Sequence, residues 1–276
     1  MQQQHQALTL GADPELFIKQ GNDFLSAHSY LEGSKHQPVP VAKGAIQVDG
    51  CAAEFNIDPC SSVKDWLYNL GVVQEAIQLR LDKFNLGLTL VPQPTVKFSD
   101  EYFDTIPPEN KILGCEYDWC AYAEERKAPT YEQEDAPVRT SGGHVHFGFD
   151  LNDDRKANPE SPKSITSDFS LTKQLDCSLY LGSLLFDHDE ERRLVYGQVG
   201  SFRPKSYGME YRVLSSAWLR SENLKRWVFE TATWAFNDWV AGRMYYEEID
   251  INKFSSKNPE EIKEALASLG IEEPKE

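Results

Sequence analysis

The centre of this chain is marked by the stretch Ser141-Gly142-Gly143-His144-Val145-His146-Phe147-Gly148-Phe149, in which residues alternate as in a strand. His144 and His146 share one face, and Val145 and Phe147 take the other. Two of the six histidines lie within three residues, and the paired glycines let another group approach the backbone closely. This pattern favours a metal or phosphate site. A buried histidine pair held by hydrogen bonds is the alternative.

Two further stretches place paired polar side chains on one strand face. Asp13 and Glu15, in Gly-Ala-Asp-Pro-Glu-Leu-Phe-Ile, are two residues apart, so both carboxylates point to the same side of a strand. Carboxylates this close repel each other unless a cation lies between them. A solvated strand face is the alternative. Glu210 and Arg212 have the same spacing in Gly-Met-Glu-Tyr-Arg-Val-Leu.

Glu54 lies among small and apolar residues in Asp-Gly-Cys-Ala-Ala-Glu-Phe-Asn, which begins at Asp49. A carboxylate in such a strand needs a partner if it faces inward. The predicted metal ligands are therefore Asp13, Glu15, Glu54, His144 and Glu210. Oxygen ligands with one imidazole favour Mg²⁺ or Mn²⁺ over zinc.

Cationic side chains gather within 21 residues of an otherwise acidic chain, at Arg192, Arg193, Arg203, Lys205 and Arg212. Guanidinium groups hold phosphate oxygens bidentately, which predicts a polyphosphate clamp. Ion pairs with Glu190, Glu191 and Glu210 are the alternative.

The composition narrows the classes of partner. The chain has 276 residues, 40% of them hydrophobic. Its net charge of -16 and the lack of a basic run argue against nucleic acid as a binding partner. No stretch approaches the roughly 20 apolar residues of a membrane span, and the first residues lack signal-peptide features. We therefore expect a cytoplasmic protein. Reduced thiols are expected at Cys51, Cys60, Cys115, Cys120 and Cys177, since no Cys-x-x-Cys spacing occurs.

The order of elements predicts one α+β domain with a mainly antiparallel sheet. Alternating residues predict extended segments at Ala12–Lys19, Ile46–Ile57, Leu86–Lys97, Gly142–Asp150 and Gly208–Leu214. Helical spacing predicts helices over Val63–Phe84, Leu171–Phe186 and Glu222–Tyr245, the last with its tryptophans in the core. A terminal helix begins after Asn258 as its cap, with Pro259 in the first turn. Residues 117–136 and 151–169 are interpreted as surface insertions.

The motifs, in their order, resemble those of known ligases. The stretches at 13–17, 141–146 and 210–212 resemble three strands of glutamine synthetases. Together with Asp-Gly-x-x-x-Glu-Phe-Asn, Arg-x-x-Tyr-Gly and Tyr-Gly-x-Glu-Tyr-Arg, they are more similar to phage-type carboxylate-amine ligases of the glutamine synthetase and glutamate-cysteine ligase superfamily. The resemblance spans about residues 11–245 and leaves 246–276 as a helical extension. It departs at Asp13, where the family more often has Glu.

This resemblance implies a curved antiparallel sheet, with helices on its convex side and Mg²⁺ between ATP and an acceptor carboxylate on its concave face. Glu15, Glu54, Glu210 and His144 would be metal ligands. The nucleotide would be bound by His146, Arg193, Arg203, Lys205 and Arg212. Arg203 and Arg212 would act on the transferred phosphoryl group, and Glu54 is counted with them as catalytic.

The implied activity is an ATP-dependent ligase that joins a small or peptidic carboxylate to an amine through an acyl phosphate and releases ADP and phosphate. If the chain is phage-encoded, it would act in the host cytoplasm. Two alternatives stay open: a metal-dependent hydrolase that uses His144 and His146, and an inactive ligase fold that only binds its ligands.

Overall fold

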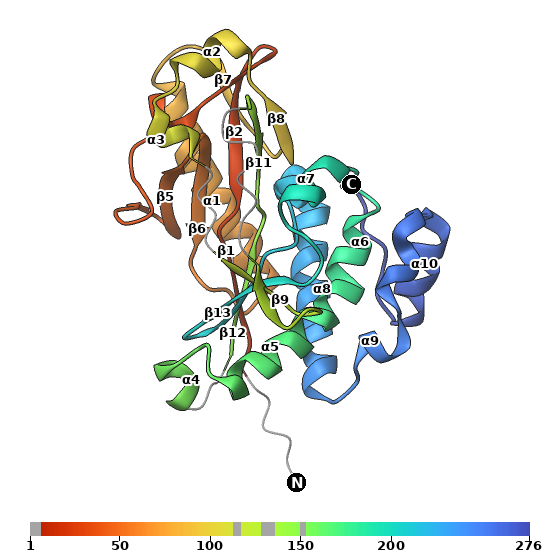
Figure 1. Ribbon diagram of the computed structural model, residues 1–276. Helices are drawn as coiled ribbons and strands as arrows, with labels where there is room; N and C mark the ends of the chain where they lie inside the picture. Colours follow the sequence, from red (N-terminus) through yellow and green to blue (C-terminus); the bar gives the residue numbers. More distant parts are fainter. Residues whose placement is uncertain (1–6, 113–116, 128–135, 150–152) are drawn as a thin grey trace.

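The computed structural model describes residues 7–112, 117–127, 136–149 and 153–276, which form an α+β structure with antiparallel strands (Figure 1). The first sheet has the strand order β1 (Thr9–Ala12), β12 (Val145–Gly148), β14 (Gly208–Tyr211), β13 (Ser201–Lys205), β9 (Asp118–Cys120) and β10 (Glu125–Lys127). It contains the predicted histidine strand at β12 and the predicted Glu210 strand at β14.

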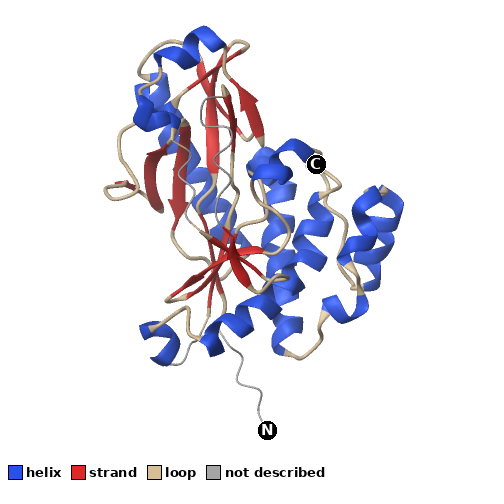
Figure 2. Ribbon diagram, in the orientation of Figure 1, coloured by secondary structure: helices blue, strands red, loops and turns tan. Residues whose placement is uncertain are grey.

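A second sheet is built from the N-terminal third of the chain, in the order β3 (Asp23–Leu25), β2 (Glu15–Gln20), β6 (Ala52–Ile57), β5 (Gly44–Asp49) and β4 (Val39–Val41), with β7 (Leu88–Val91) paired to β2. A two-stranded sheet joins β8 (Thr95–Lys97) and β11 (Val138–Thr140). The α+β class is thus confirmed. The strands of the described residues are divided among three sheets, none strongly curled, so a single curved sheet is not observed (Figure 2).

The chain passes from the first sheet to the second at Asp13 and Pro14. Strand β1 ends at Ala12 and β2 begins at Glu15, so the predicted segment Ala12–Lys19 is two strands rather than one. Pro14 lacks the N–H that a continuous strand needs for pairing. Asp13 and Glu15 therefore lie at a junction between sheets, not on one face of one strand.

Two other predicted segments also divide. Ile46–Ile57 is the β5–β6 hairpin, which turns at Gly50 with φ +55°. A left-handed backbone conformation there suits glycine. The segment Leu86–Lys97 separates into β7 and β8, which pair with different strands.

The long helices follow the predicted apolar spacing. Helix α1 (Val63–Asp82) is capped by Ser62, α8 (Glu222–Val240) by Ser221, and α10 (Pro259–Ser268) by Asn258, as predicted for the last. The other helical elements are η1 (Ala27–Ser29), α2 (Asp100–Thr105), α3 (Pro108–Lys111), α4 (Asp153–Ala157), α5 (Pro162–Leu175), the π-helical η2 (Asp176–Tyr180), α6 (Leu181–Ser183), α7 (Glu190–Val195), η3 (Ser216–Arg220), α9 (Tyr245–Glu248) and η4 (Ile251–Ser256).

The prediction of a surface insertion at 151–169 is wrong where the structure describes it. Helix α5 begins at Pro162, nine residues before the predicted start at Leu171, and buries Phe169. Arg155, only 3% exposed, donates to Asp168 and to the carbonyl of Gly208, and so ties α4 to the first sheet. The polar, proline-rich sequence conceals this buried ion pair. Residues 151–152 lie outside the described part.

The second predicted insertion, 117–136, is also partly wrong, because β9 and β10 extend the first sheet. Residues 128–135 are outside the description. Of the α8 tryptophans, Trp227 is buried as predicted, whereas Trp234 is 51% exposed. Cys51, Cys60, Cys120 and Cys177 are buried free thiols, and Cys115 is not among the described residues.

One cluster of buried apolar side chains joins the two large sheets and the main helices. At its centre Trp66 of α1 stacks on Trp218 of η3, with ring centroids 5.6 Å apart. Helix α1 packs against the second sheet and α5 against β13, while α8 contacts both helices (Figure 1). Across the described residues, every helix is too short or too polar to span a bilayer. The shared core holds the two sheets in a fixed relation.

Asp176 gives this core a pH-dependent weakness. Burial raises its pKa to about 7, although Tyr211 donates a hydrogen bond to its carboxylate at 2.7 Å. The unfolded chain releases this proton near pH 4, while the folded chain retains it to about pH 7, so stability falls as pH rises through this window. In the unaltered protein, this group should lower the free energy of unfolding by up to about 4 kcal/mol between pH 4 and pH 7, and Asp176→Asn should remove this change. Urea unfolding at pH 4.5 to 7 measures it, and a variant difference independent of pH would contradict it.

Candidate active site

All predicted site residues except Arg192 and Arg193 line one cavity of about 640 Å³, whose two main walls come from the two large sheets. The first wall is set by strand register. His146 of β12 is opposite Glu210 of β14, which is opposite Arg203 of β13. Side chains two residues along a strand share a face. His144, Arg212 and Lys205 therefore belong to the same wall as this row.

The second wall is acidic. Glu15 of β2 lies opposite Glu54 of β6, and Gln47 of β5 donates to Glu54 from the other side. Burial and the neighbouring Asp49 raise the pKa of Glu15 to about 7. Burial and the charges of Asp13 and Glu15 raise the pKa of Glu54 well above its ordinary value. Carboxylates are perturbed in this way where burial and neighbouring negative charges outweigh the positive charges around them.

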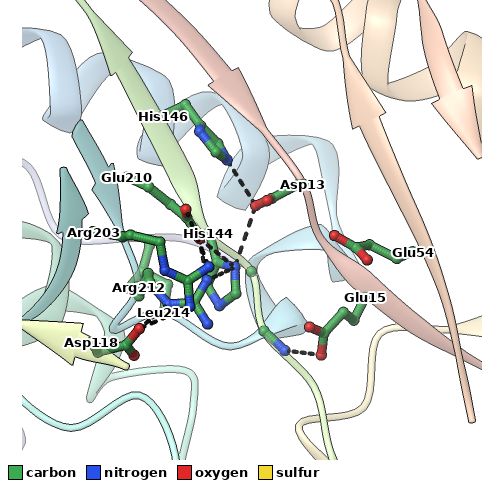
Figure 3. Close-up of polar contacts among 12 residues, drawn as sticks. Asp13, Glu15, Glu54, Asp118, His144, His146, Arg203, Glu210, Arg212 and Leu214 are labelled. Carbon is green, nitrogen blue, oxygen red and sulfur yellow. Dashed lines mark hydrogen bonds and ion pairs between the residues drawn. The ribbon is translucent and has the colours of Figure 1, made fainter. Parts of the chain in front are cut away.

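Asp13, His146 and Glu210 form a compact group at the first wall, with one ligand atom of each within 4.8 Å of the others (Figure 3). Asp13 Oδ1 lies 3.0 Å from His146 Nε2. Although burial opposes ionisation, the charge of His146 holds the pKa of Asp13 low. Nδ1 of His146 contacts the hydroxyl of Tyr207 at 2.5 Å, which fixes the ring.

His144 is held at both ring nitrogens and is 3% exposed. Nδ1 lies 3.3 Å from Asp13 Oδ1 and 3.4 Å from Glu210 Oε1, and Nε2 is 2.9 Å from the hydroxyl of Tyr196. Arg212 also donates to that hydroxyl, at 2.8 Å. Burial and the charge of Arg212 lower the pKa of His144, which favours the neutral ring.

Asp118 is a site residue that the sequence did not predict, as are Tyr196 and Tyr207. Its Oδ1 lies 2.9 Å from Nε of Arg212 and 3.1 Å from Nη2 of Arg203, so it holds both guanidinium groups (Figure 3). The residue lies on β9, within a segment predicted to be an insertion. Its short Asp-Trp-Cys strand gives too weak a periodic signal to distinguish it from a loop.

Arg192 and Arg193 do not belong to the cationic wall. Arg193 pairs with Asp187 at 3.3 Å, and it is absent from the residues that line the cavity. Arg192 is buried and donates to the carbonyls of Ser141, Val213 and Leu214. It thereby fastens the chain before β12 to the chain after β14. The three remaining cations of the predicted clamp do face the cavity.

The glycine pair before His144 lets the His144 ring and the Ser215 backbone lie against the main chain. A Cβ at Gly142 would overlap the His144 ring, and one at Gly143 would overlap the carbonyl oxygen of Ser215. The Gly142 N–H also donates to Glu15 Oε2 at 2.7 Å, while the Glu15 N–H donates to the Gly142 carbonyl at 2.9 Å. These two bonds join the walls of the cavity.

Gly143→Ala should destabilise the fold by about 2 kcal/mol or more, because the methyl group meets backbone rather than a movable side chain. Gly71→Ala is the matched control: Gly71 lies in α1 with open space around it, and alanine there should stabilise by about 0.5 to 1 kcal/mol. Chemical denaturation of both variants measures the contrast. Equal effects would show that the close approach is not a constraint.

The comparison with protein families supports the recognised resemblance. Residues 136–257 match the family model "phage phiEco32-like COOH.NH2 ligase-type 2". The matched segment is less than half of the chain and contains both histidines, Arg203, Lys205, Glu210 and Arg212. The match confirms the resemblance to phage-type carboxylate-amine ligases over these residues. Asp13, Glu15 and Glu54 precede the match. No curated protein matches this chain.

Proposed function

We propose that this protein is an ATP-dependent ligase that joins a carboxylate to an amine through an acyl phosphate and releases ADP and phosphate. The observation that supports it most is the cavity, which brings together carboxylates from both walls, two imidazoles and the three cations of the first wall. Such a site combines ligands for Mg²⁺ or Mn²⁺ with groups that hold phosphate oxygens. The matched family consists of carboxylate-amine ligases.

The donor set fits a divalent metal ion. Among the described residues, Asp13 Oδ1, His146 Nε2 and Glu210 Oε2 are buried atoms without a hydrogen-bond partner, and each lies close to an ionisable side chain. These atoms would hold the ion at the first wall, and Glu15 with Glu54 would hold a cation at the second. When bound, the metal would offset charge on phosphate oxygens.

This proposal revises the roles of the two histidines. His146 supplies the imidazole ligand, because its Nε2 faces Asp13 and its Nδ1 is fixed by Tyr207. His144 orients Asp13 and Glu210 from beneath, with Tyr196 behind it. The sequence resemblance implied the opposite assignment.

Arg203 and Arg212 are the groups proposed to stabilise the transferred phosphoryl group. Both face the cavity from adjacent strands, and Asp118 orients them. A planar guanidinium group contacts two phosphate oxygens at once, and these contacts strengthen as charge develops during transfer.

Turnover with ATP, Mg²⁺ and a pool of carboxylates and amines should yield ADP and phosphate, because an acyl phosphate forms by cleavage at the γ-phosphorus. Chromatography of the nucleotide products measures this. AMP as the main product would contradict the acyl-phosphate route, metal-dependent amide hydrolysis without nucleotide would favour the hydrolase, and nucleotide binding without turnover would indicate an inactive ligase fold.

Arg212→Lys should lower kcat by roughly 30-fold, about 2 kcal/mol, with a smaller loss of ATP affinity, since lysine keeps the charge but not the planar fork. Arg193→Lys is the matched control, because Arg193 pairs with Asp187 away from the cavity. It should leave both constants near those of the unaltered protein. Similar kinetics for the two variants would remove Arg212 from the reaction.

A further inference from the structure

Glu210 already has positive partners at both carboxylate oxygens. Its Oε1 contacts Arg212, and its Oε2 lies 2.7 Å from Nζ of Lys205, with Nη1 of Arg203 at 3.9 Å. The carboxylate is 1% exposed. Although burial opposes ionisation, Arg212 and the other nearby positive charges hold the pKa of Glu210 well below its ordinary value. Any divalent ion that binds this carboxylate therefore enters a position that is already neutralised.

Lys205 differs from the two arginines in how it is held. Arg203 and Arg212 are also bound by Asp118, and Arg212 by Tyr196 as well. Lys205 contacts Glu210 alone among the interactions of the described residues, and its side chain is 28% exposed. Its ammonium is a compact charge on a flexible stem. Of the three cations, Lys205 can leave Glu210 without breaking a second contact.

The metal position and the Lys205 ammonium compete for one atom. Glu210 Oε2, which Lys205 occupies, is among the buried atoms without a protein hydrogen bond. The Lys205 ammonium lies 2.7 Å from Glu210 Oε2, so a divalent ion bound to that oxygen would repel it. Lys205 also lines the cavity, so a displaced ammonium stays in reach of a ligand bound there.

We propose that Lys205 is a resident counter-ion of Glu210, which a divalent metal ion displaces and which then contacts an anionic group in the same cavity. The inference rests on the proposed metal site. It makes metal and polyanion binding mutually reinforcing: the metal releases the lysine, and the polyanion then binds it. By linkage, each ligand raises the affinity for the other by the same factor.

The test is calorimetric titration of Mn²⁺ alone into the full chain and into Lys205→Met. The variant should bind Mn²⁺ at least about fivefold more tightly, because the competing charge is gone. If Lys205 served only to bind a phosphate, the substitution would leave Mn²⁺ affinity unchanged. Repeating the titration with saturating pyrophosphate should show a smaller enhancement in the variant than in the unaltered protein. Lys205→Gln gives the same comparison if methionine disturbs folding.

Two controls separate the possible failures. Lys163→Met makes the same chemical change at an exposed position on α5 and should leave Mn²⁺ affinity unaltered, while His146→Ala should weaken it. If Lys205→Met and Lys205→Gln bind Mn²⁺ no more tightly than the unaltered protein, the counter-ion role is overturned and the ligase proposal stands. If neither they nor the unaltered protein bind Mn²⁺, with or without pyrophosphate, both proposals fail.

Discussion

The buried charge of Glu210 is the constraint on which the rest of the site depends. A carboxylate removed from water in the middle of a sheet is costly unless cations and hydrogen bonds surround it. Arg212 and Lys205 meet that need, and Arg212 in turn requires Asp118 and Tyr196. The partners come from β9, β13, β14 and the end of α7. The neighbouring strands β14, β13 and β9 of the first sheet thus bring Glu210, Lys205 and Asp118 side by side.

The second constraint is the passage between sheets at Asp13 and Pro14. Two residues separated by a single proline serve opposite walls: Asp13 contacts the histidines, and Glu15 faces Glu54. The paired hydrogen bonds between Glu15 and Gly142 hold this crossing in place. A change at the crossing therefore moves both walls relative to each other, because Asp13 follows the last residue of β1 and Glu15 begins β2.

Sequence periodicity predicts what lies on one strand and fails where several elements meet. The two-residue spacing of His144 and His146 correctly predicted a shared face, and that of Glu210 and Arg212 did the same. The passage from the first sheet to the second at Asp13 and Pro14 was not predicted, because the residues of Ala12–Lys19 alternate as in one strand. The separate roles of the five cations also escaped, since an arginine that binds carbonyls has the same sequence signal as one that faces a ligand.

The tertiary contacts that sequence could not supply are those over long separations. Asp118 reaches Arg203 across 85 positions, and Tyr196 reaches His144 across 52. Asp118 lies outside the motifs, so only the packing of β9 reveals its role. Tyr196 lies in the Arg-x-x-Tyr-Gly motif, but the motif alone does not show that its hydroxyl contacts His144. The sequence predicts the start of α5 nine residues too late for a related reason. The Arg155–Asp168 pair is buried, but both residues lie in a polar stretch typical of a surface segment.

The two walls of the cavity place the same type of side chain in opposite electrostatic states. Burial and neighbouring carboxylates raise the pKa values of Glu15 and Glu54, whereas cations and imidazoles outweigh burial and lower those of Asp13 and Glu210. A cation that arrives at the Glu15–Glu54 wall relieves a repulsion. One that arrives at Glu210 replaces a charge already present. The first wall can therefore exchange one positive charge for another, whereas a cation at the second wall separates two carboxylates that repel each other.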